Sequence, residues 1–293
     1  MDSASNLSSK LQLLIGGTAI AGIALVVLLL PNTPQVAAGF STHEIVWIEL
    51  ILLVSGLMSG LSGFGFSAVG AACLLLIPPT IEVPLLQALS TGNQLLSVGQ
   101  LREDMPRSFD ELIAGPGPCI LGGLVGVPIG TWLLHNLPAQ RLMMMFGGLL
   151  VGYAFYSIVK ADGTRLRRFV GPAAGAGVGC IGGLIGGFTA FPGAAVVVWT
   201  GLQNLNKKRN RAIVQPYILV LQIFALANNA WSHSEVFGTR MWILLAVTLP
   251  VVLSGTLLGV RLYRRISDVN FKRISYFLLG VSGAVLLVKT LSG

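Results

Sequence analysis

One apolar stretch, too long for a single membrane crossing, constrains the fold of this chain most. From Glu44 to Pro79 the chain is apolar for about 35 residues, and one helix of that length would extend ~50 Å, against about 30 Å of bilayer hydrocarbon. The stretch must therefore break within the membrane. Gly60, Gly63 and Gly65 mark the place, because glycine adopts backbone conformations that other residues avoid.

A second stretch, from Phe169 to Leu202, is also long, apolar and rich in glycine. When residues 55–78 are shifted by 123, seven of the 24 positions become identical, most of them glycine or alanine. Two Gly-x-x-x-Gly motifs, at 126–130 and 255–259, are related by a similar shift of 129. Similar motifs in the same order and at similar spacing indicate an internal duplication.

Composition identifies the environment of these segments. Of the 293 residues, 54% are hydrophobic and 10% charged, whereas about 25% are charged in a soluble domain, so we expect an all-α polytopic membrane protein. The net charge of +8 does not indicate nucleic-acid binding, since Lys and Arg lie in short loops between apolar runs. Cys73, Cys119 and Cys180 lie in apolar segments without metal-ligand spacing. We therefore expect no metal, cofactor or disulfide.

Further apolar runs predict single transmembrane helices. The first, Leu11–Leu30, exceeds the ~7–15 residues of a signal-peptide apolar region and predicts an uncleaved N-terminal helix. The others are Leu85–Leu101, Leu112–Leu134, Leu142–Val159, Ala212–Ala230, Met241–Leu262 and Ile274–Leu287.

The positive-inside rule orients these segments. It places the basic loops 160–168, 207–211 and 261–273 in the cytoplasm together with the N-terminus. The loops 31–43 and 78–84 lack Lys and Arg and are placed outside. The first glycine-broken segment then begins and ends outside, the second begins and ends inside, and the C-terminus lies outside.

The predicted fold is therefore an inverted repeat. Each half has a glycine-broken helical hairpin, either re-entrant or crossing twice, followed by three transmembrane helices. The chain divides into residues 1–44 (N-terminal helix and loop), 45–160 (first repeat) and 161–293 (second, inverted repeat). Inverted repeats with interrupted helices are typical of secondary transporters, whose substrate site lies at the interruptions.

The two breaks are the predicted substrate site. A broken helix exposes backbone N–H groups at the start of its second arm, and their partial positive charge attracts an anion. Amide side chains on the spans that follow could add hydrogen bonds. The predicted site residues are Ser62, Gly63, Phe64, Gly65, Phe66, Ser67, Asn93, Gln94, Gly186, Gly187, Phe188, Thr189, Pro192 and Gln215.

Structural roles compete with some of these assignments. Interhelical hydrogen bonding alone would also explain amide side chains within the membrane. Close helix packing would explain a ladder of glycines at every fourth position. The ladder consists of Gly171, Gly175, Gly179, Gly183 and Gly187.

Other polar residues are expected at the membrane surface. Glu49 and Asn229 lie near the ends of predicted spans, where we expect a solvated interface. His43, His135 and His233 fall in predicted loops, which argues against a histidine proton relay at the membrane centre.

The paired motifs resemble those of the sulfite exporter TauE/SafE family of membrane proteins. The resemblance covers roughly residues 45–290 and rests on Gly60-Leu-Ser-Gly-Phe-Gly65, Gly183-Leu-Ile-Gly-Gly-Phe-Thr-Ala-Phe-Pro192 and Arg211-Ala212. It implies a multi-pass permease of the bacterial inner (plasma) membrane that moves sulfite or an organosulfonate. Phe64 and Phe66 in the first motif, and Phe188-Thr189 in the second, stand where the family is richer in glycine, which leaves the substrate open.

Three functions are compatible with these motifs. A secondary transporter would move the small anion by alternating access, and an anion channel would conduct it; neither is an enzyme. A rhomboid-like serine protease is the third, because Gly60-Leu-Ser62-Gly63 fits its Gly-x-Ser-Gly pattern, but that chemistry needs a histidine beside the serine. We expect the transporter, with a small anion and the lipid bilayer as partners and no nucleic acid. The oligomeric state stays open, a homodimer being one option.

Overall fold

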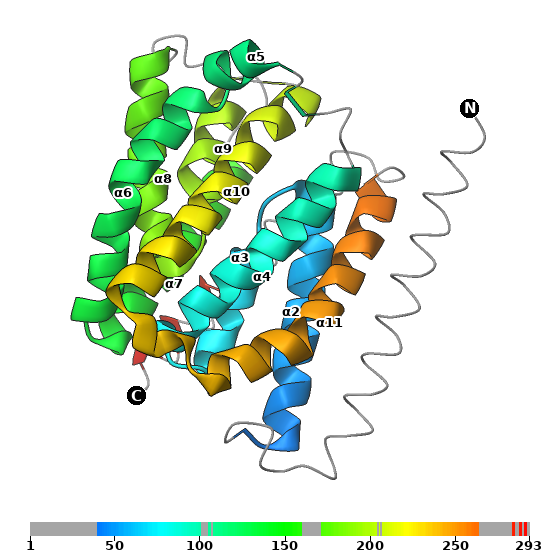
Figure 1. Ribbon diagram of the computed structural model, residues 1–293, viewed down its shortest axis with the longest axis vertical. Helices are drawn as coiled ribbons and strands as arrows, with labels where there is room; N and C mark the ends of the chain where they lie inside the picture. The colour runs from blue at the N-terminus through cyan, green and yellow to red at the C-terminus, as the bar shows by residue number, and fades with distance from the viewer. Residues whose placement is uncertain are drawn as a thin grey trace.

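The computed structural model describes residues 40–100, 105–106, 108–159, 171–203, 205, 207–263, 283–284, 287–288 and 290–291. These residues form helices and connecting turns, and no strand occurs among them (Figure 1). The all-α expectation is thereby confirmed. The predicted helix at 11–30 lies outside the described residues, as does most of the predicted span at 274–287.

The described helices follow one another along the chain. In order they are α2 (Thr42–Ser62), α3 (Phe66–Gly70), η2 (Ala71–Leu75), α4 (Pro79–Gln100), α5 (Phe109–Ala114), α6 (Gly117–Asn136), α7 (Ala139–Val159), α8 (Pro172–Thr189), α9 (Gly193–Leu202), α10 (Lys207–Ser232), η4 (Ser234–Phe237) and α11 (Thr239–Tyr263). Of these, α2, α6, α8, α10 and α11 are long and apolar enough to cross a membrane.

The helix α4 begins earlier than the sequence predicts. An outer loop is predicted at 78–84, whereas α4 already begins at Pro79 and includes Pro84. Pro79 lies in the first turn, where the missing N–H of a proline has no intrahelical acceptor, whereas Pro84 lies in the second turn. The N–H groups of Ile81 and Glu82 both donate to the Pro78 carbonyl, at 3.0 and 2.9 Å. The loop prediction is therefore wrong, and Glu82 lies in a helix.

Glycines let two pairs of helices pack backbone to backbone: α2 lies beside α11, and α6 lies beside α8 (Figure 1). A Cβ atom at Gly60 would overlap the Thr256 carbonyl of α11, and one at Gly183 would overlap the Gly123 carbonyl of α6. Such contacts are typical of small-residue helix interfaces in membranes. The predicted packing role is confirmed for Gly179, Gly183 and Gly187, while Gly171 and Gly175 make no such backbone contact.

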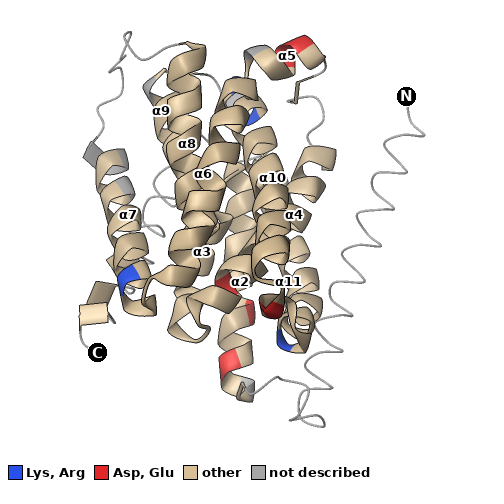
Figure 2. Cartoon of the chain, turned by 60° about the vertical axis from the view of Figure 1, so that its left-hand side comes forward, with Lys and Arg blue, Asp and Glu red and all other residues tan. Residues whose placement is uncertain are grey.

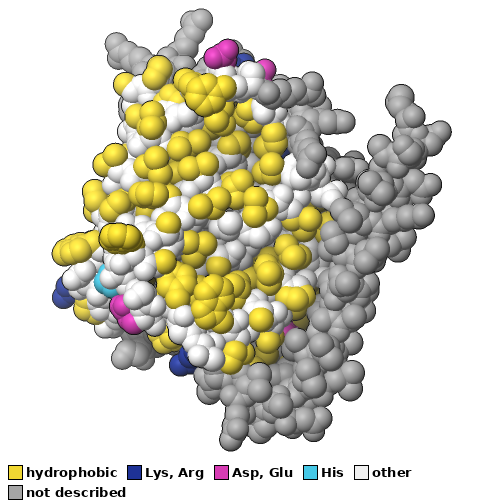
Figure 3. Space-filling model, viewed as in Figure 1, with side chains coloured by type: hydrophobic (Ala, Val, Ile, Leu, Met, Phe, Trp, Pro, Cys, Tyr) yellow, Lys and Arg dark blue, Asp and Glu magenta, His cyan; other side chains and the backbone are white. Residues whose placement is uncertain are grey.

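The outer face of the bundle suits a lipid environment. On α6 the side chains of Leu121, Val125 and Trp132 are exposed, and Figure 3 shows hydrophobic side chains spread over one face of the molecule. The Lys, Arg, Asp and Glu residues that Figure 2 colours lie toward the ends of the helices. Together with the apolar spans, this surface supports a multi-pass location in a membrane.

Candidate substrate site

Two glycines break the first segment. The helix α2 ends at Ser62, and Gly63 (φ 79°) and Gly65 (φ 86°) take left-handed conformations before α3 begins at Phe66. The Ser62 hydroxyl is held inside this turn, where it donates to the carbonyl one helical turn earlier at 2.7 Å and accepts from the Phe64 N–H at 3.1 Å. The predicted first break is confirmed.

The second segment breaks at the end of the predicted range. The sequence predicts a break at 186–189 and a second arm that begins near 189–193; α8 continues to Thr189, and Ala190 takes the left-handed conformation at φ 57°. The next helix, α9, begins directly after Pro192. The Cβ atom of this proline lies 2.6 Å from a Cβ placed at Gly186. Glycine therefore serves close packing here, not backbone freedom.

Two glutamine side chains connect the breaks to neighbouring helices by hydrogen bonds. Gln94 of α4 donates through Nε2 to the Gly63 carbonyl at 3.1 Å, and Gln222 of α10 donates to the Ala190 carbonyl at 2.7 Å. Gly63 and Ala190 are the left-handed residues that end α2 and α8. Both glutamines are buried, so each break is held by the same kind of contact.

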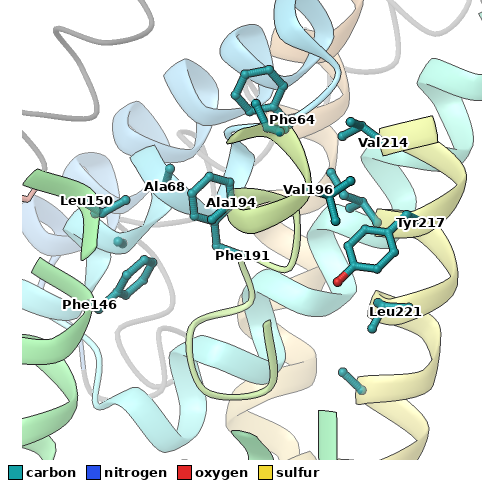
Figure 4. Packing of buried hydrophobic residues seen from close by; sticks show 14 of the residues in the cluster. Phe64, Ala68, Phe146, Leu150, Phe191, Ala194, Val196, Val214, Tyr217 and Leu221 are labelled. Atoms are coloured by element: carbon teal, nitrogen blue, oxygen red, sulfur yellow. The ribbon is translucent and has the colours of Figure 1, made fainter. Parts of the chain in front are cut away.

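The two breaks line one cavity. Its other walls come from α4 and α10. Phe64 and Phe191, one from each break, belong to a single buried apolar cluster that also holds Ala68 and Ala194 (Figure 4). The lining residues are Phe64, Gly65, Phe66, Ser67, Ser90, Gln94, Ala190, Phe191, Pro192, Gly193, Ile218 and Gln222.

The helices α3 and α9 both begin at this cavity. Their first residues, Phe66 and Gly193, line it. The first N–H groups of a helix have no intrahelical acceptor and carry partial positive charge. In α3 the N–H of Val69 is the first to bond within the segment, to the Gly65 carbonyl at 3.2 Å. None of the described lining residues is charged, so the cavity offers neutral donors to a small anion.

Comparison with known protein families adds the decisive observation. The family model described as sulfite exporter TauE/SafE matches residues 48–286. The chain belongs to this family. No curated protein and no solved structure matches the chain. As a TauE/SafE family member with several membrane-length apolar helices, the protein is a membrane transporter.

In this TauE/SafE family member, the predicted site residues fall into two groups. Those that line the cavity are Phe64, Gly65, Phe66, Ser67, Gln94 and Pro192. Those outside the lining are Ser62, Gly63, Asn93, Gly186, Gly187, Phe188, Thr189 and Gln215. The protease interpretation of Ser62 gains no support, because its hydroxyl bonds the backbone of its own turn and no histidine among the described residues.

Asn93 and Gln215 have different surroundings. Asn93 donates to Ser59 Oγ at 2.6 Å and accepts from Thr256 Oγ1 at 2.9 Å, so it joins α4 to α2 and α11. This is the interhelical role that the sequence leaves open. Gln215 of α10 lies beside the first break, with Nε2 at 3.0 Å from a Cβ placed at Gly63. Neither amide atom of Gln215 has a hydrogen-bond partner among the described residues.

The remaining predicted residues support the end of α8. Thr189 donates to the Ile185 carbonyl at 2.6 Å and accepts from the Phe191 N–H at 3.1 Å. A Cβ at Gly187 would lie 2.5 Å from the Val127 carbonyl of α6. Phe188 is buried in an apolar cluster. These residues fix the second break without lining the cavity.

Several residues that line the cavity are not among the predicted site residues. They are Ser90, Ala190, Phe191, Gly193, Ile218 and Gln222. Helical spacing could have found two of them, because Ser90 lies one turn before Gln94 and Gln222 lies two turns after Gln215. Nothing in the sequence marks the left-handed conformation of Ala190.

Arg211, at the start of α10, hydrogen-bonds to the C-terminal end of α2. Its buried guanidinium donates through Nη2 to the carbonyls of Gly60 and Leu61, at 3.1 and 2.7 Å, and stacks over the Tyr263 ring, with Cζ 3.8 Å from the ring centroid. A positive charge is favourable at a helix C-terminus. The basic segment predicted as a loop at 207–211 therefore belongs to α10 and contacts the first break.

Two polar residues expected at the solvated surface are buried instead. Glu49 is 8% exposed and Asn229 is fully buried. Asn229 Oδ1 contacts His135 Nε2 at 3.0 Å, and its Nδ2 donates to Gln87 Oε1 at 3.1 Å. Gln87 donates in turn to the Gly186 carbonyl at 3.3 Å. The interfacial prediction is wrong because packing between helices covers positions near the ends of spans.

Proposed function

We propose that this TauE/SafE family transporter moves sulfite, or a similarly small sulfur oxyanion, by alternating access, and that the anion binds between the two breaks. The observation that carries the proposal is the shared cavity, at which the N-terminal ends of α3 and α9 meet. Helix N-termini facing a site near the centre of the bundle are the arrangement by which broken helices bind anions in transporters.

The lining of the cavity favours a small oxyanion. The hydroxyls of Ser67 and Ser90 line it. Gln94 and Gln222 each use one amide hydrogen on a break, and an amide nitrogen carries a second. These neutral hydrogen-bond donors suit the oxygen atoms of sulfite.

An inverted repeat would produce this cavity, and we assign residues 45–160 and 161–293 to its two halves. The left-handed residues Gly63 and Ala190 are 127 positions apart, and the bonded glutamines Gln94 and Gln222 are 128 apart. Corresponding helices run in opposite directions, with α4 rising where α10 descends (Figure 1). The spacing is about one helical turn longer than the shift of 123 that aligns the glycines.

Flux measurements test the proposed function. Purified protein in proteoliposomes should show saturable flux of radiolabelled sulfite, with sulfate, thiosulfate and a small sulfonate as competitors of graded strength. Protein-free vesicles give the background. If none of these anions shows saturable flux, the proposed substrate class is wrong. Electrogenic flux far above carrier rates would instead favour the channel.

A further inference from the structure

The carboxyl group of Glu82 is buried and has no hydrogen-bond partner among the described residues. Glu82 lies in the first turn of α4 and is 0% exposed. Neither carboxylate oxygen has a hydrogen-bond partner among the described residues. Its surroundings are apolar, since Val83, Leu86 and the facing Cys73 belong to one buried hydrophobic cluster. Burying an ionised carboxylate in apolar surroundings costs free energy. Ionisable residues that are kept inside membrane proteins are therefore taken to have a functional role.

No described positive charge compensates this carboxyl group. The titratable side chain that faces it is Cys73 of η2, which is close enough to interact with it electrostatically. Other titratable groups on elements packed against α4 include Glu49 on α2, His135 on α6, Arg141 on α7, Arg211 on α10, Glu235 on η4 and Arg240 on α11. None of these forms an ion pair or hydrogen bond with Glu82. Structural ion pairing therefore does not explain the buried acid.

Glu82 is connected to the substrate cavity along α4. Residues 82, 86, 90 and 94 follow one helix face at one-turn intervals, and Ser90 and Gln94 line the cavity. Two turns separate Glu82 from Ser90, which is about 12 Å along the axis. Leu86 lies between them and would meet a Cβ placed at Gly70 at 2.8 Å. Glu82 and the cavity-lining residues Ser90 and Gln94 therefore lie on the same face of α4.

The segment formed by α3 and η2 connects the same two places. It runs from Phe66 at the cavity to Leu75, and it carries Cys73, which is close enough to Glu82 to interact with it electrostatically. Its C-terminal end has partial negative charge, which opposes ionisation of a neighbouring carboxyl, whereas the N-terminal end of α4 favours ionisation. The charge state of Glu82 therefore depends on how this segment packs on α4.

We propose that Glu82 is the proton-binding site that couples anion transport to a proton gradient. This inference rests on the proposed function. The carboxylate takes up one proton while the α3–η2 segment packs on it and releases that proton when the segment moves. An anion at the start of the segment adds negative charge and favours protonation, so anion and proton travel in the same direction. A metal ion would need several oxygen ligands, and no such cluster occurs among the described residues.

Infrared spectroscopy tests the proton without requiring any transport. At neutral pH the wild-type spectrum should contain the carbonyl stretch of a protonated carboxylic acid, and Glu82→Gln should lose it. The amide has the shape of the protonated acid, so the variant should fold. Glu235→Gln, which changes an exposed acid in η4, is the matched control and should keep the band. A wild-type spectrum without the band, or a Glu82→Gln spectrum identical to the wild type, overturns the proposal.

Transport of radiolabelled sulfite tests the coupling. Wild type and Glu235→Gln should accumulate sulfite in proteoliposomes under an imposed pH gradient, beyond the level in protein-free vesicles. Glu82→Gln should lose this accumulation and keep exchange of sulfite for sulfite. Gradient-driven accumulation by Glu82→Gln, or wild-type exchange that ignores the gradient, overturns the proposal. Absence of wild-type sulfite exchange contradicts the proposed function instead, and the infrared result then decides whether Glu82 holds a proton.

Discussion

Gly63 is the residue on which the first break depends most. Its φ of 79° is a left-handed conformation that costs other residues roughly 1–2 kcal/mol. A Cβ there would also lie 3.0 Å from Gln215 Nε2. The buried amide of Gln215 would have to move, which would disturb the packing of α10 against the end of α2.

Gly63→Ala should therefore abolish sulfite flux in proteoliposomes while the protein still inserts and purifies as a folded species. Gly148→Ala in α7 is the control, because a Cβ at Gly148 meets no atom within 4 Å; this variant should transport like the wild type. Unchanged flux in Gly63→Ala would show that the break tolerates an ordinary backbone conformation.

The first break is predictable from the sequence, and the second only approximately. Gly63 and Gly65 mark their own position because both take left-handed conformations. At the second break the glycines are needed for packing, and Ala190 takes the left-handed conformation, which is uncommon for a residue with a side chain. The burial of Glu49 and Asn229 depends on neighbouring helices, and a single span's sequence does not contain that information.

The paired helices depend on glycines whose contacts are with backbone atoms. A side chain can rotate away from an added methyl group, but a carbonyl in a helix cannot. At Gly183 an added Cβ would overlap the Gly123 carbonyl of α6, whereas a Cβ at Gly177 in the same helix meets no atom within 4 Å. The two positions therefore separate packing from helix propensity.

Gly183→Ala should lower the thermal unfolding temperature in detergent, since α6 and α8 would have to separate; overpacking typically costs about 1–3 kcal/mol. Gly177→Ala should be neutral or more stable by up to about 1 kcal/mol, because alanine is the better helix former. Equal unfolding temperatures for the two variants would contradict the backbone-to-backbone packing.

Most helix positions follow from the apolar runs, but the start of α4 does not. The spans predicted at 212–230 and 241–262 lie within α10 and α11. The predicted loop at 78–84 contains three prolines, a residue that often ends a helix, whereas in the structure Pro79 opens α4. A proline at a first turn and a proline in a loop look alike in sequence.

For the whole molecule, the basic loops predict how the two halves are oriented in the membrane. The basic loops place the side of α5 in the cytoplasm and the side of η4 outside. Asp110 in α5 and Glu235 in η4 are both exposed, so cysteines there should be accessible to a membrane-impermeant thiol reagent.

Asp110→Cys should label only from the cytoplasmic side, and Glu235→Cys only from the outer side. The native Cys73 and Cys119 are buried, and the unsubstituted protein gives the background. Labelling of both variants from one side would refute the proposed orientation. The packing of α2 on α11 and of α8 on α6 joins the halves; such cross-pairing could not be derived from the repeat in the sequence alone.

The central claim is that the anion passes through the cavity between the two breaks, and a cavity-filling variant tests it most directly. Ser90 lines the cavity and is 2% exposed, so Ser90→Leu would occupy the space of the anion. Gly99→Leu adds a similar side chain to the same helix at a position where a Cβ meets no atom within 4 Å. Saturable sulfite flux should persist in the wild type and in Gly99→Leu and disappear in folded Ser90→Leu. Undiminished flux through Ser90→Leu would contradict the account.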